Sequence, residues 1–566
     1  MSAVDVAQAL YLLLAALGLA LAVSYAGLPV LSQGAFVAVG GFGTALLGPG
    51  GRALPLGFAV ALAVAAAGLA GAGVALAASR LSGAPLALAT WALAWLVAEV
   101  LRAAPEQFGG EQGLVRATPA VLVSPSLGLE IVLTPLVHVA LALLLCAGTA
   151  AALVRLDRGP GGLDLAALRE GPELAASLGV PVAARRTAVL ATAAALGGLA
   201  GAGTTVLLGL VAAPDVGPLL SLQLFVAVLV GGTARWWGPV LGVAVLVALP
   251  PLADALSRGA GLDVVRARGV LTAALLIGVL AVRALARRRT PPRPAVPGSL
   301  ERVPVRPAPA WRPVLLRARG VTATYGGLRA LDGVDLVLRG GEVHALVGPN
   351  GSGKSTLLQV LAGDLPPGSG TVEVAGRLLR SRGTASRVLA GVARTPQRTV
   401  LLPRMTPQAQ VAVGARGGSR APLAVLRHLL ATPSSRCADD VRGGVVAAAL
   451  RDSGLGGVRA RTARLPAGEQ RLLQVARAVA TGATVLLLDE PAAGMSAAER
   501  VRLAEVLRAL AGNGCAVLLV EHDLRLVNQV AERVTVLDRG SVLAVGRPEA
   551  VRADPAVRRA YLGEPA

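Results

Sequence analysis

The stretch Gly348-Pro349-Asn350-Gly351-Ser352-Gly353-Lys354-Ser355-Thr356 fits the phosphate-binding loop pattern G-x-x-x-x-G-K-[ST]. Its lysine is the only lysine among 54 basic residues, and all the others are arginines. At solvated positions the two residue types exchange easily, but a planar guanidinium does not replace a compact ammonium that reaches phosphate oxygens. The surviving lysine therefore marks a site where geometry forbids the exchange. We expect the chain to bind a nucleoside triphosphate.

Apolar runs around this loop predict an α/β P-loop domain over residues 315–566, where short strand-like runs alternate with helical stretches. Val343–Val347 is expected to be the strand that feeds the loop. The segment from Lys354 is expected to be the helix whose N-terminus receives the phosphates. Two further apolar runs, Val485–Leu488 and Leu518–Val520, are predicted to be buried strands that end in polar residues.

The polar residues that end these two strands are candidates for chemistry. A buried strand explains its apolar residues, but not the two adjacent acids Asp489 and Glu490 at its end. Asp489 can hold Mg²⁺ with help from the Ser355 hydroxyl, and Glu490 can polarise an attacking water. His522, one of four histidines, can contact a γ-phosphate, although a lone histidine at a strand end more often has a structural role.

The N-terminal half has a different composition, which predicts an all-α polytopic membrane domain over residues 1–285. Between Asp5 and Arg52 lie 46 residues without a charge, enough for two membrane crossings. Further uncharged runs bring the expected number of spans to about eight or nine. Residues 286–314 are rich in proline and arginine, which is typical of a semi-rigid linker. The alternative, a large apolar soluble bundle, rarely sustains so many long runs.

The formal net charge of +21 suggests nucleic-acid binding at first sight. The arginines cluster instead in 155–186 and 283–293, next to predicted spans, as the positive-inside rule expects of cytoplasmic loops near anionic lipid. We therefore expect a bilayer and no nucleic acid as partner. The N-terminus lacks an early basic residue and an obvious small-residue cleavage site, so we expect no removable signal peptide. Its lack of positive charge predicts that it lies outside the cytoplasm. Cys146, Cys437 and Cys515 have no metal-ligand spacing.

Taken in order, the P-loop, the two strand ends and two further residues resemble an ABC-transporter ATPase. Gln397 matches the family's Q-loop, and Tyr325 matches the aromatic residue that stacks on adenine. The resemblance implies ATP hydrolysis with ATP and Mg²⁺ as cofactors. It implies catalytic roles for Glu490, His522 and Gln397, nucleotide contacts from Tyr325, the P-loop residues and Asp489, and magnesium contacts from Ser355, Gln397 and Asp489.

The signature region departs from this family. Family members carry Leu-Ser-(Gly or Tyr)-Gly-(Gln or Glu)-Gln, and this chain has Leu465-Pro466-Ala467-Gly468-Glu469-Gln470. Proline supplies neither a hydroxyl nor an N–H to the partner subunit's γ-phosphate. The hypothesis is an asymmetric pair of ATP sites, of which only one is strongly hydrolytic. Alternatively, Gly468 and the following helix N-terminus suffice.

The ATPase half resembles the Liv type of branched-chain amino-acid importer, through Asp489–Met495 and the ending Val551–Gly563. The membrane half resembles the matching permease, through Ser24–Phe36, Phe108–Leu114 and Trp237–Gly242. Residues 157–186 resemble the permease's coupling loop, whose short helix docks beside the Q-loop; otherwise they form a surface helix on a cytoplasmic loop. The resemblance implies a second permease, a second ATPase and an extracytoplasmic substrate-binding protein as partners, with the chain in the cytoplasmic membrane and its ATPase domain in the cytoplasm.

Alternatives remain open. The same architecture serves importers of urea, amides or other small polar metabolites, and a non-transporting regulatory subunit with a degraded ATPase is a candidate from another class. A homodimer would place a proline in both signatures. Within the membrane half, Gly27, Pro29, Ser32 and Gly34 interrupt the first apolar run. They serve either a polar pathway lined by free backbone groups or close helix packing.

Overall fold

A computed structural model describes most of the chain. The described residues are 2–49, 54–79, 81–115, 121–124, 129–232, 237–248, 274, 278, 281, 312–325, 327–379, 383–397, 401–402, 405–415, 444–453, 455 and 465–562. Residues 286–311 of the expected linker, Cys437 and the second arginine cluster lie outside this part.

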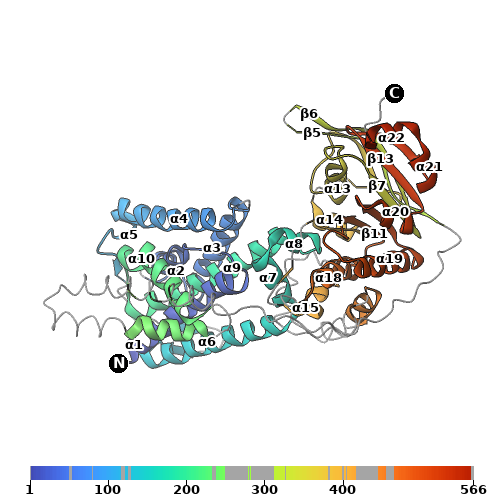
Figure 1. The fold of residues 1–566 in the computed structure, drawn as a ribbon. Helices are drawn as coiled ribbons and strands as arrows, with labels where there is room; N and C mark the ends of the chain where they lie inside the picture. Colours follow the sequence, from blue (N-terminus) through green and yellow to red (C-terminus); the bar gives the residue numbers. More distant parts are fainter. Residues whose placement is uncertain are drawn as a thin grey trace. The chain divides into compact units, whose positions relative to one another are not determined.

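The described residues divide into two compact units (Figure 1). The first holds residues 2–170 and those described between 182 and 281, and the second holds 171–181 and those described from 312 onward. The first unit is helical, and the second combines helices with sheets. The predicted order of an all-α membrane domain followed by an α/β P-loop domain is therefore confirmed.

Nine α-helices and four other short elements make up most of what is described of the first unit. In chain order they are α1 (Ala3–Ala20), the π-helix η1 (Leu21–Tyr25), α2 (Gln33–Leu47), α3 (Leu56–Ala77), α4 (Ala84–Ala103), α5 (Pro105–Phe108), β1 (Leu114–Val115), α6 (Pro135–Arg158), α7 (Pro160–Glu170), α9 (Val182–Leu208), β4 (Leu210–Val211), the 3₁₀-helix η2 (Ala213–Val216) and α10 (Pro218–Gly231). β1 pairs with β4, and β2 (Val121–Ser124) pairs with β3 (Leu129–Val132), both antiparallel.

Six helices in the described residues are long and apolar enough to cross a membrane: Ala3–Tyr25, Leu56–Ala77, Ala84–Ala103, Pro135–Asp157, Val182–Leu208 and Ala213–Gly231. Gln33–Leu47 and Gly238–Ala248 are shorter apolar helices. The expected eight or nine spans include segments outside the described residues, so that number stays a prediction. The 46-residue uncharged run contains one full-length span and the shorter helix α2.

The expected interruption of the first apolar run lies between η1 and α2. Gly27 has φ +70°, and a Cβ built on it would lie 2.5 Å from Arg169 Cγ, so only glycine fits there. Arg169 Nη1 donates to the Ser24 carbonyl at 2.8 Å, which satisfies a backbone group that the interruption leaves free. The end of α7 is thereby tied to the break.

Close helix packing is evident along α2, which follows the break. A Cβ on Gly40 would lie 1.9 Å from the carbonyl oxygen of Gly198 on α9. A Cβ on Gly34 would lie 2.4 Å from the carbonyl oxygen of Gly217. Small residues thus let the backbones approach each other, as they do in many membrane bundles. Of the two explanations for these glycines, the geometry supports packing at Gly34 and Gly40.

The second unit contains two sheets. The larger has the order β10-β11-β12-β7-β13-β14, with parallel pairs from β10 to β13 and an antiparallel final pair. Its strands are β7 (Glu342–Val347), β10 (Val392–Thr395), β11 (Val485–Asp489), β12 (Ala516–Val520), β13 (Arg533–Asp538) and β14 (Ser541–Gly546). β7, β11 and β12 are buried throughout, which is why their sequences are nearly continuous apolar runs. The predicted strands are confirmed.

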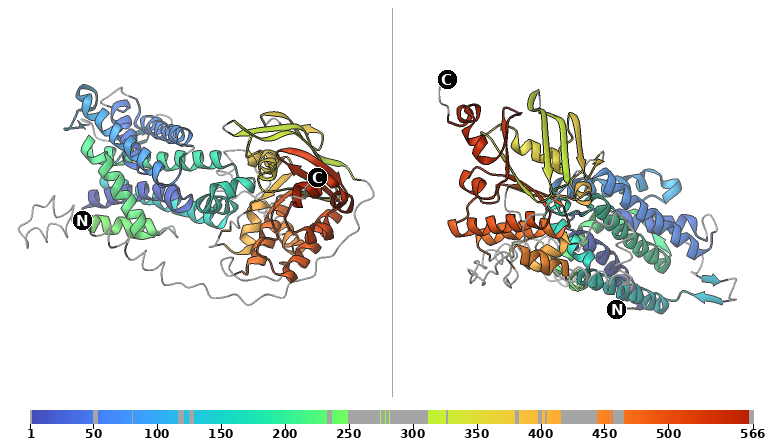
Figure 2. Two further views of the ribbon diagram at one scale, coloured as in Figure 1. Left: turned by 45° about the horizontal axis from the view of Figure 1, so that its top comes forward. Right: turned by 90° about the vertical axis from the view of Figure 1, so that its right-hand side faces the viewer.

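The smaller sheet is antiparallel, with the order β6-β5-β8-β9. Its strands are β5 (Val314–Tyr325), β6 (Leu328–Arg339), β8 (Ser369–Val374) and β9 (Arg377–Leu378). Figure 2 shows it in yellow-green, apart from the orange and red helices of the same unit. One apolar core joins it to α13 (Lys354–Ala362), and another joins α18 (Ala467–Ala480) and α19 (Ala497–Gly512) to β11 and β12. The remaining helices are α14 (Thr384–Leu389), α15 (Pro407–Gly414), α20 (Leu524–Val530), α21 (Pro548–Ala553) and α22 (Pro555–Leu562).

The loop 157–186 is divided between the units. Its helix α7 belongs to the first unit, where Asp164 forms a buried ion pair of 3.1 Å with Arg185 at the start of α9. Its short helix α8 (Pro172–Ser177) belongs to the second unit and packs against α14 and β10. Gly179, just after α8, lies against the Val388 side chain of α14. β10 ends two residues before Gln397, so α8 lies beside the segment expected to be the Q-loop.

His344 on β7 predicts a pH dependence of stability. Its Nε2 lies 2.7 Å from Thr535 Oγ1, and Glu342 and Arg533 are its charged neighbours. Burial, reinforced by Arg533, lowers the pKa of His344 to about 4. Between its ordinary pKa of about 6.5 and this value the unfolded chain binds a proton that the native state excludes, so stability falls as pH falls.

From pH 7 to pH 5 we expect the unit to lose about 2 kcal/mol of unfolding free energy through His344. Hydrogen exchange of the β7 amides in the full chain, at both pH values, measures the loss. Burial raises the pKa of Glu342, which acts in the opposite direction, so the difference between the wild type and His344→Gln isolates the histidine. An equal pH response in both proteins would contradict the expectation.

Candidate nucleotide-binding site

The loop between β7 and α13 forms the centre of the site. β7 ends at Val347, and α13 begins at Lys354, so the quoted stretch occupies the turn as predicted. Gly353 caps α13 with φ +101°, and a Cβ there would lie 2.6 Å from the Ala330 carbonyl oxygen. No other residue adopts this backbone without displacing β6. The helix N-terminus faces the loop, where backbone N–H groups favour an anion.

Lys354 is held against the loop itself. Its Nζ donates to the carbonyl oxygens of Gly348 at 2.8 Å and Pro349 at 2.7 Å, and the side chain is almost fully buried. Burial lowers the pKa of Lys354, while the negative charges of Glu490 and Asp489 act to raise it. A desolvated ammonium with carbonyl partners is available to a stronger acceptor such as a phosphate oxygen.

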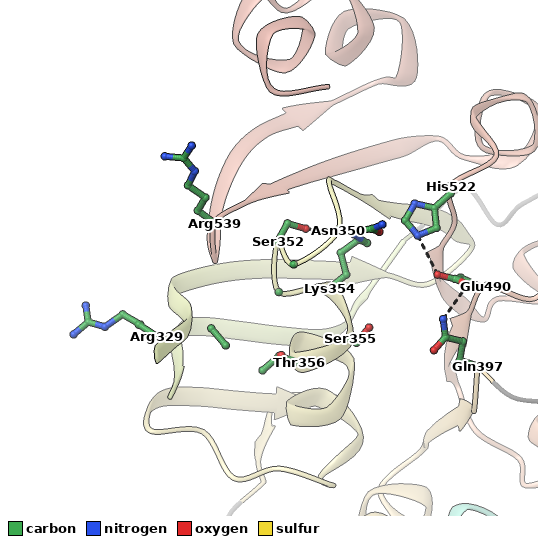
Figure 3. Close-up of a pocket in the computed structure, with 13 residues that line it drawn as sticks. Arg329, Asn350, Ser352, Lys354, Ser355, Thr356, Gln397, Glu490, His522 and Arg539 are labelled. Carbon is green, nitrogen blue, oxygen red and sulfur yellow. Dashed lines mark hydrogen bonds and ion pairs between the residues drawn. The ribbon is translucent and has the colours of Figure 1, made fainter. Parts of the chain in front are cut away.

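The loop borders a cavity of about 560 Å³ (Figure 3). Ten of its lining residues were predicted from the sequence: Asn350, Gly351, Ser352, Gly353, Lys354, Ser355, Thr356, Gln397, Glu490 and His522. Three were not: Arg329, Ala330 and Arg539. In a chain whose basic residues are nearly all arginine, nothing in the sequence distinguishes Arg329 and Arg539 from the rest. Both are exposed at the rim of the cavity, where they add positive charge.

Three strand ends bring the candidate catalytic groups together. Gln397, Glu490 and His522 follow β10, β11 and β12, which are parallel neighbours, so their carboxyl ends share one edge. Gln397 Nε2 donates to Glu490 Oε2 at 3.0 Å, and His522 Nε2 lies 3.0 Å from Glu490 Oε1 (Figure 3). Glu490 has φ +45°, a strained value for a residue with a side chain. The turn after β11 thus aims its carboxylate between its two neighbours.

Asp489, one residue earlier, points elsewhere and is almost fully buried. It accepts a hydrogen bond of 3.1 Å from Arg394 Nη2. Burial raises the pKa of Asp489, and Arg394 and Lys354 act to lower it. Arg394 Nη1 also donates to Asp364 at 2.8 Å, and Thr384 at the start of α14 donates to the same carboxylate. A polar chain therefore runs from α14 to Asp489.

The proposed magnesium contacts suit that ion chemically. Asp489, Ser355 and Gln397 offer a carboxylate, a hydroxyl and an amide oxygen, the hard oxygen ligands that Mg²⁺ prefers. Among the described residues there is no group of three or more His, Cys, Asp or Glu that could hold a metal ion. A single carboxylate agrees with an ion bound mainly through phosphates and waters.

The signature residues form the first turn of α18. Pro466 is the N-cap and makes no side-chain capping bond, and Ala467 is the first helical residue. A Cβ on Gly468 would meet the carboxylate of Glu499, a flexible side chain that would have to move. Glu469 is buried, which raises its pKa, and Gln470 Nε2 donates to the Leu465 carbonyl at 2.7 Å. None of the five lines the described cavity.

Arg471, which the sequence analysis did not single out, joins this helix to the site. Its Nη1 donates to the Gln397 carbonyl at 2.6 Å. The position of Gln397 therefore depends on α18 as well as on β10. Tyr325, the expected adenine platform, is the last residue of β5, and its side chain lies outside the described part of the structure.

Three families of known proteins match the chain. The branched-chain amino acid transport system / permease component family matches residues 6–280. The ABC transporter family matches residues 331–493, and the branched-chain amino acid ATP-binding cassette transporter family matches residues 541–566. The ABC transporter match contains the P-loop, Gln397 and Glu490, and His522 lies between the last two matches.

Curated relatives of the second half include ATP-binding proteins of amino-acid transport. The high-affinity branched-chain amino acid transport ATP-binding protein LivG of Salmonella typhimurium is 36% identical over 252 residues, which cover 44% of this chain and 98% of LivG. The corresponding protein BraF of Pseudomonas aeruginosa is 34% identical over 255 residues, 45% of this chain and 99% of BraF. The ribose import ATP-binding protein RbsA 2 of Rhizobium etli is 34% identical over 245 residues, which cover 43% of this chain and 46% of that protein.

Proposed function

Because this chain belongs to the branched-chain amino acid ABC transporters, as a permease fused to its ATPase, we propose that it couples ATP hydrolysis to the uptake of branched-chain or related amino acids. The observation that carries the proposal is the occurrence of both likenesses in one chain. The permease family covers residues 6–280, and the ATPase relatives are nearly fully covered by the second half. The chain is a membrane protein with an ABC ATPase domain, which we assign to the cytoplasm.

In the proposed mechanism Lys354 leaves the Gly348 and Pro349 carbonyls for the phosphates of ATP, and the α13 N-terminus supports their negative charge. Glu490 orients and polarises the attacking water, and His522 and Gln397 hold its carboxylate through the contacts of 3.0 Å. Ser355, Gln397 and Asp489 would hold Mg²⁺, which neutralises developing charge on the phosphates. Tyr325 is assigned to adenine stacking.

Uptake of labelled leucine by the complex reconstituted with its partner subunits and binding protein tests the proposal. Wild-type protein should accumulate leucine only with ATP. Glu490→Gln should lower the ATP hydrolysis rate about 100-fold or more, and uptake with it, while ATP affinity remains. Glu549→Gln, an exposed glutamate at the start of α21, is the matched control and should behave as wild type. ATP-dependent uptake of urea in place of leucine would favour the urea and amide alternative, and hydrolysis without any uptake would favour a regulatory subunit.

We further propose that the assembled transporter has one weak ATP site, because Pro466 stands where the family has a serine. Pro466 is the N-cap of α18. It offers neither a side-chain hydroxyl nor a backbone N–H to a phosphate near the first turn of this helix. The partner's ATP would face this turn, while Lys354, Asp489 and Glu490 would face the partner's signature. This arrangement favours a second, different ATPase subunit over a homodimer.

Pro466→Ser should raise the ATPase rate of the assembled complex by about twofold or more, because a second site begins to turn over and a restored donor to transition-state charge is worth several kcal/mol. Steady-state phosphate release measures the rate. Ala498→Ser, on the exposed first turn of α19, provides a control for an added hydroxyl. An unchanged rate for Pro466→Ser would mean that Gly468 and the helix N-terminus suffice.

We assign the coupling between the halves to α8 and the polar chain behind it. α8 packs against α14 and β10, and α14 begins with Thr384, which donates to Asp364. Arg394 continues the chain from Asp364 to Asp489. A shift of α14 would therefore change the surroundings of a proposed magnesium ligand. Chain continuity through Glu170 and Gly171 links α8 to α7, which Arg169 ties to the break after η1.

Arg394→Gln should reduce the leucine taken up per ATP hydrolysed by about threefold or more, because the chain from α14 is broken while the contacts of Glu490 remain. Parallel uptake and phosphate-release assays give the ratio, and Mn²⁺ titration of the ATP-bound protein reports on Asp489 independently of turnover. Arg377→Gln, at an exposed arginine on β9, is the control. A normal ratio together with unchanged Mn²⁺ affinity would exclude this role.

A further inference from the structure

The first turns of α2 and α10 meet inside the membrane unit. Gly34 N–H donates to Ser221 Oγ at 2.8 Å, and the Gly34 backbone lies close against the Gly217 carbonyl. α2, with 15 residues, is short for a membrane span, whereas α10 completes the candidate span Ala213–Gly231. We call the contact of residues 32–34 with residues 217–221 the junction.

The two helices are also related in sequence. The segment Pro29-Val30-Leu31-Ser32-Gln33-Gly34-Ala35-Phe36-Val37-Ala38-Val39 aligns without a gap with Pro218-Leu219-Leu220-Ser221-Leu222-Gln223-Leu224-Phe225-Val226-Ala227-Val228, and seven of eleven positions are identical. Ser32 and Ser221 are equivalent in this repeat. Many transporters are built from internal repeats, with binding sites where broken helices of the two repeats meet.

The junction lies beside the middle of two long spans. Gln33 Nε2 donates to the Ala15 carbonyl on α1 at 3.1 Å and to the Ala193 carbonyl on α9 at 3.0 Å. These acceptors lie well inside the spans Ala3–Tyr25 and Val182–Leu208. α2 therefore begins level with the middle of these two spans, where irregular backbone is tolerated only if protein or a polar cavity surrounds it.

Two polar groups at the start of α2 have no hydrogen-bond partner among the described residues. They are Ser32 Oγ and Gln33 Oε1, on side chains that are 0% and 1% exposed. Ser32 is the N-cap of α2 and yet makes no capping bond, whereas its counterpart Ser221 accepts from Gly34. Polar groups in a membrane interior are costly without partners and are typical of substrate pathways.

We propose that the junction is a transient binding site for the charged head of a zwitterionic amino acid, an inference that rests on the proposed function. The N-termini of α2 and α10 bring partial positive charge to a carboxylate, and the Ser32 hydroxyl donates to it. The Gln33 amide oxygen accepts from the ammonium group. The site is closed in this structure, because Gly34 lies directly against Gly217. Separation of the two first turns opens it.

Ser32→Ala in the reconstituted complex tests the site. We expect the initial rate of labelled-leucine uptake to fall at least tenfold, while the thermal unfolding midpoint stays equal or rises, because a buried hydroxyl without a partner is removed. Thr44→Val is the matched control: it removes another fully buried hydroxyl of α2, one that is bonded to the Gly40 carbonyl of its own helix. Its uptake should stay within twofold of wild type.

Each other outcome overturns the inference. Wild-type uptake by Ser32→Ala refutes the site. A parallel fall in uptake and unfolding midpoint assigns Ser32 a structural role, and an equal fall for Thr44→Val shows that any buried hydroxyl of α2 matters. A wild-type complex that takes up no aliphatic amino acid refutes the proposed function, and the junction site with it. A wild type that transports alongside an equally active Ser32→Ala refutes the junction site alone.

Discussion

The contact between Glu490 and the two side chains at its flanks depends on parallel pairing of three strands. β10, β11 and β12 end at one edge of the sheet, so residues far apart in sequence arrive within hydrogen-bond distance. The strained backbone at Glu490 turns its carboxylate toward this edge, while Asp489 remains buried against Arg394. Adjacent acids with different surroundings can take different roles because one is held by neutral or weakly basic groups and the other by a guanidinium.

The same edge of the sheet lies beside α8, the helix to which we assign coupling. β10 carries Arg394 toward Asp489 and leads into Gln397, and α8 packs on β10 and α14. Arg471 holds Gln397 from the side of the signature helix. Gln397 is therefore contacted by the group that would hydrolyse ATP and by the helix that would meet the partner's ATP. In the proposed mechanism a residue in this position would respond to both nucleotides.

Much of this arrangement was predictable from the sequence, for a physical reason. Buried parallel strands must be apolar throughout, so acids or a histidine at their ends are conspicuous, and Asp489, Glu490 and His522 were found in this way. Arg329, Arg539, Arg394 and Arg471 were not, because the composition hides any one arginine among the others. The mid-depth start of α2 was missed as well, since an uncharged run of 46 residues does not reveal how deep its interruption lies. The internal repeat is present in the sequence, but only the contact between Gly34 and Ser221 shows that its two copies meet in the structure.

Glycines allow close backbone approach in both halves of the chain, but for different purposes. In the membrane unit Gly34 and Gly40 carry no side chain, so the helices pack closely, and Ser32 and Gln33 each keep a buried polar atom without a partner among the described residues. In the ATPase unit Gly353 lets the N-terminus of α13 lie close against the Ala330 carbonyl of β6. A fused chain keeps both kinds of surface at fixed stoichiometry, but it carries only one signature and one P-loop. In the proposed assembly each ATP site forms between two such domains, so the departure at Pro466 would act on the nucleotide that the partner holds, and fusion would not compensate for it within the same chain.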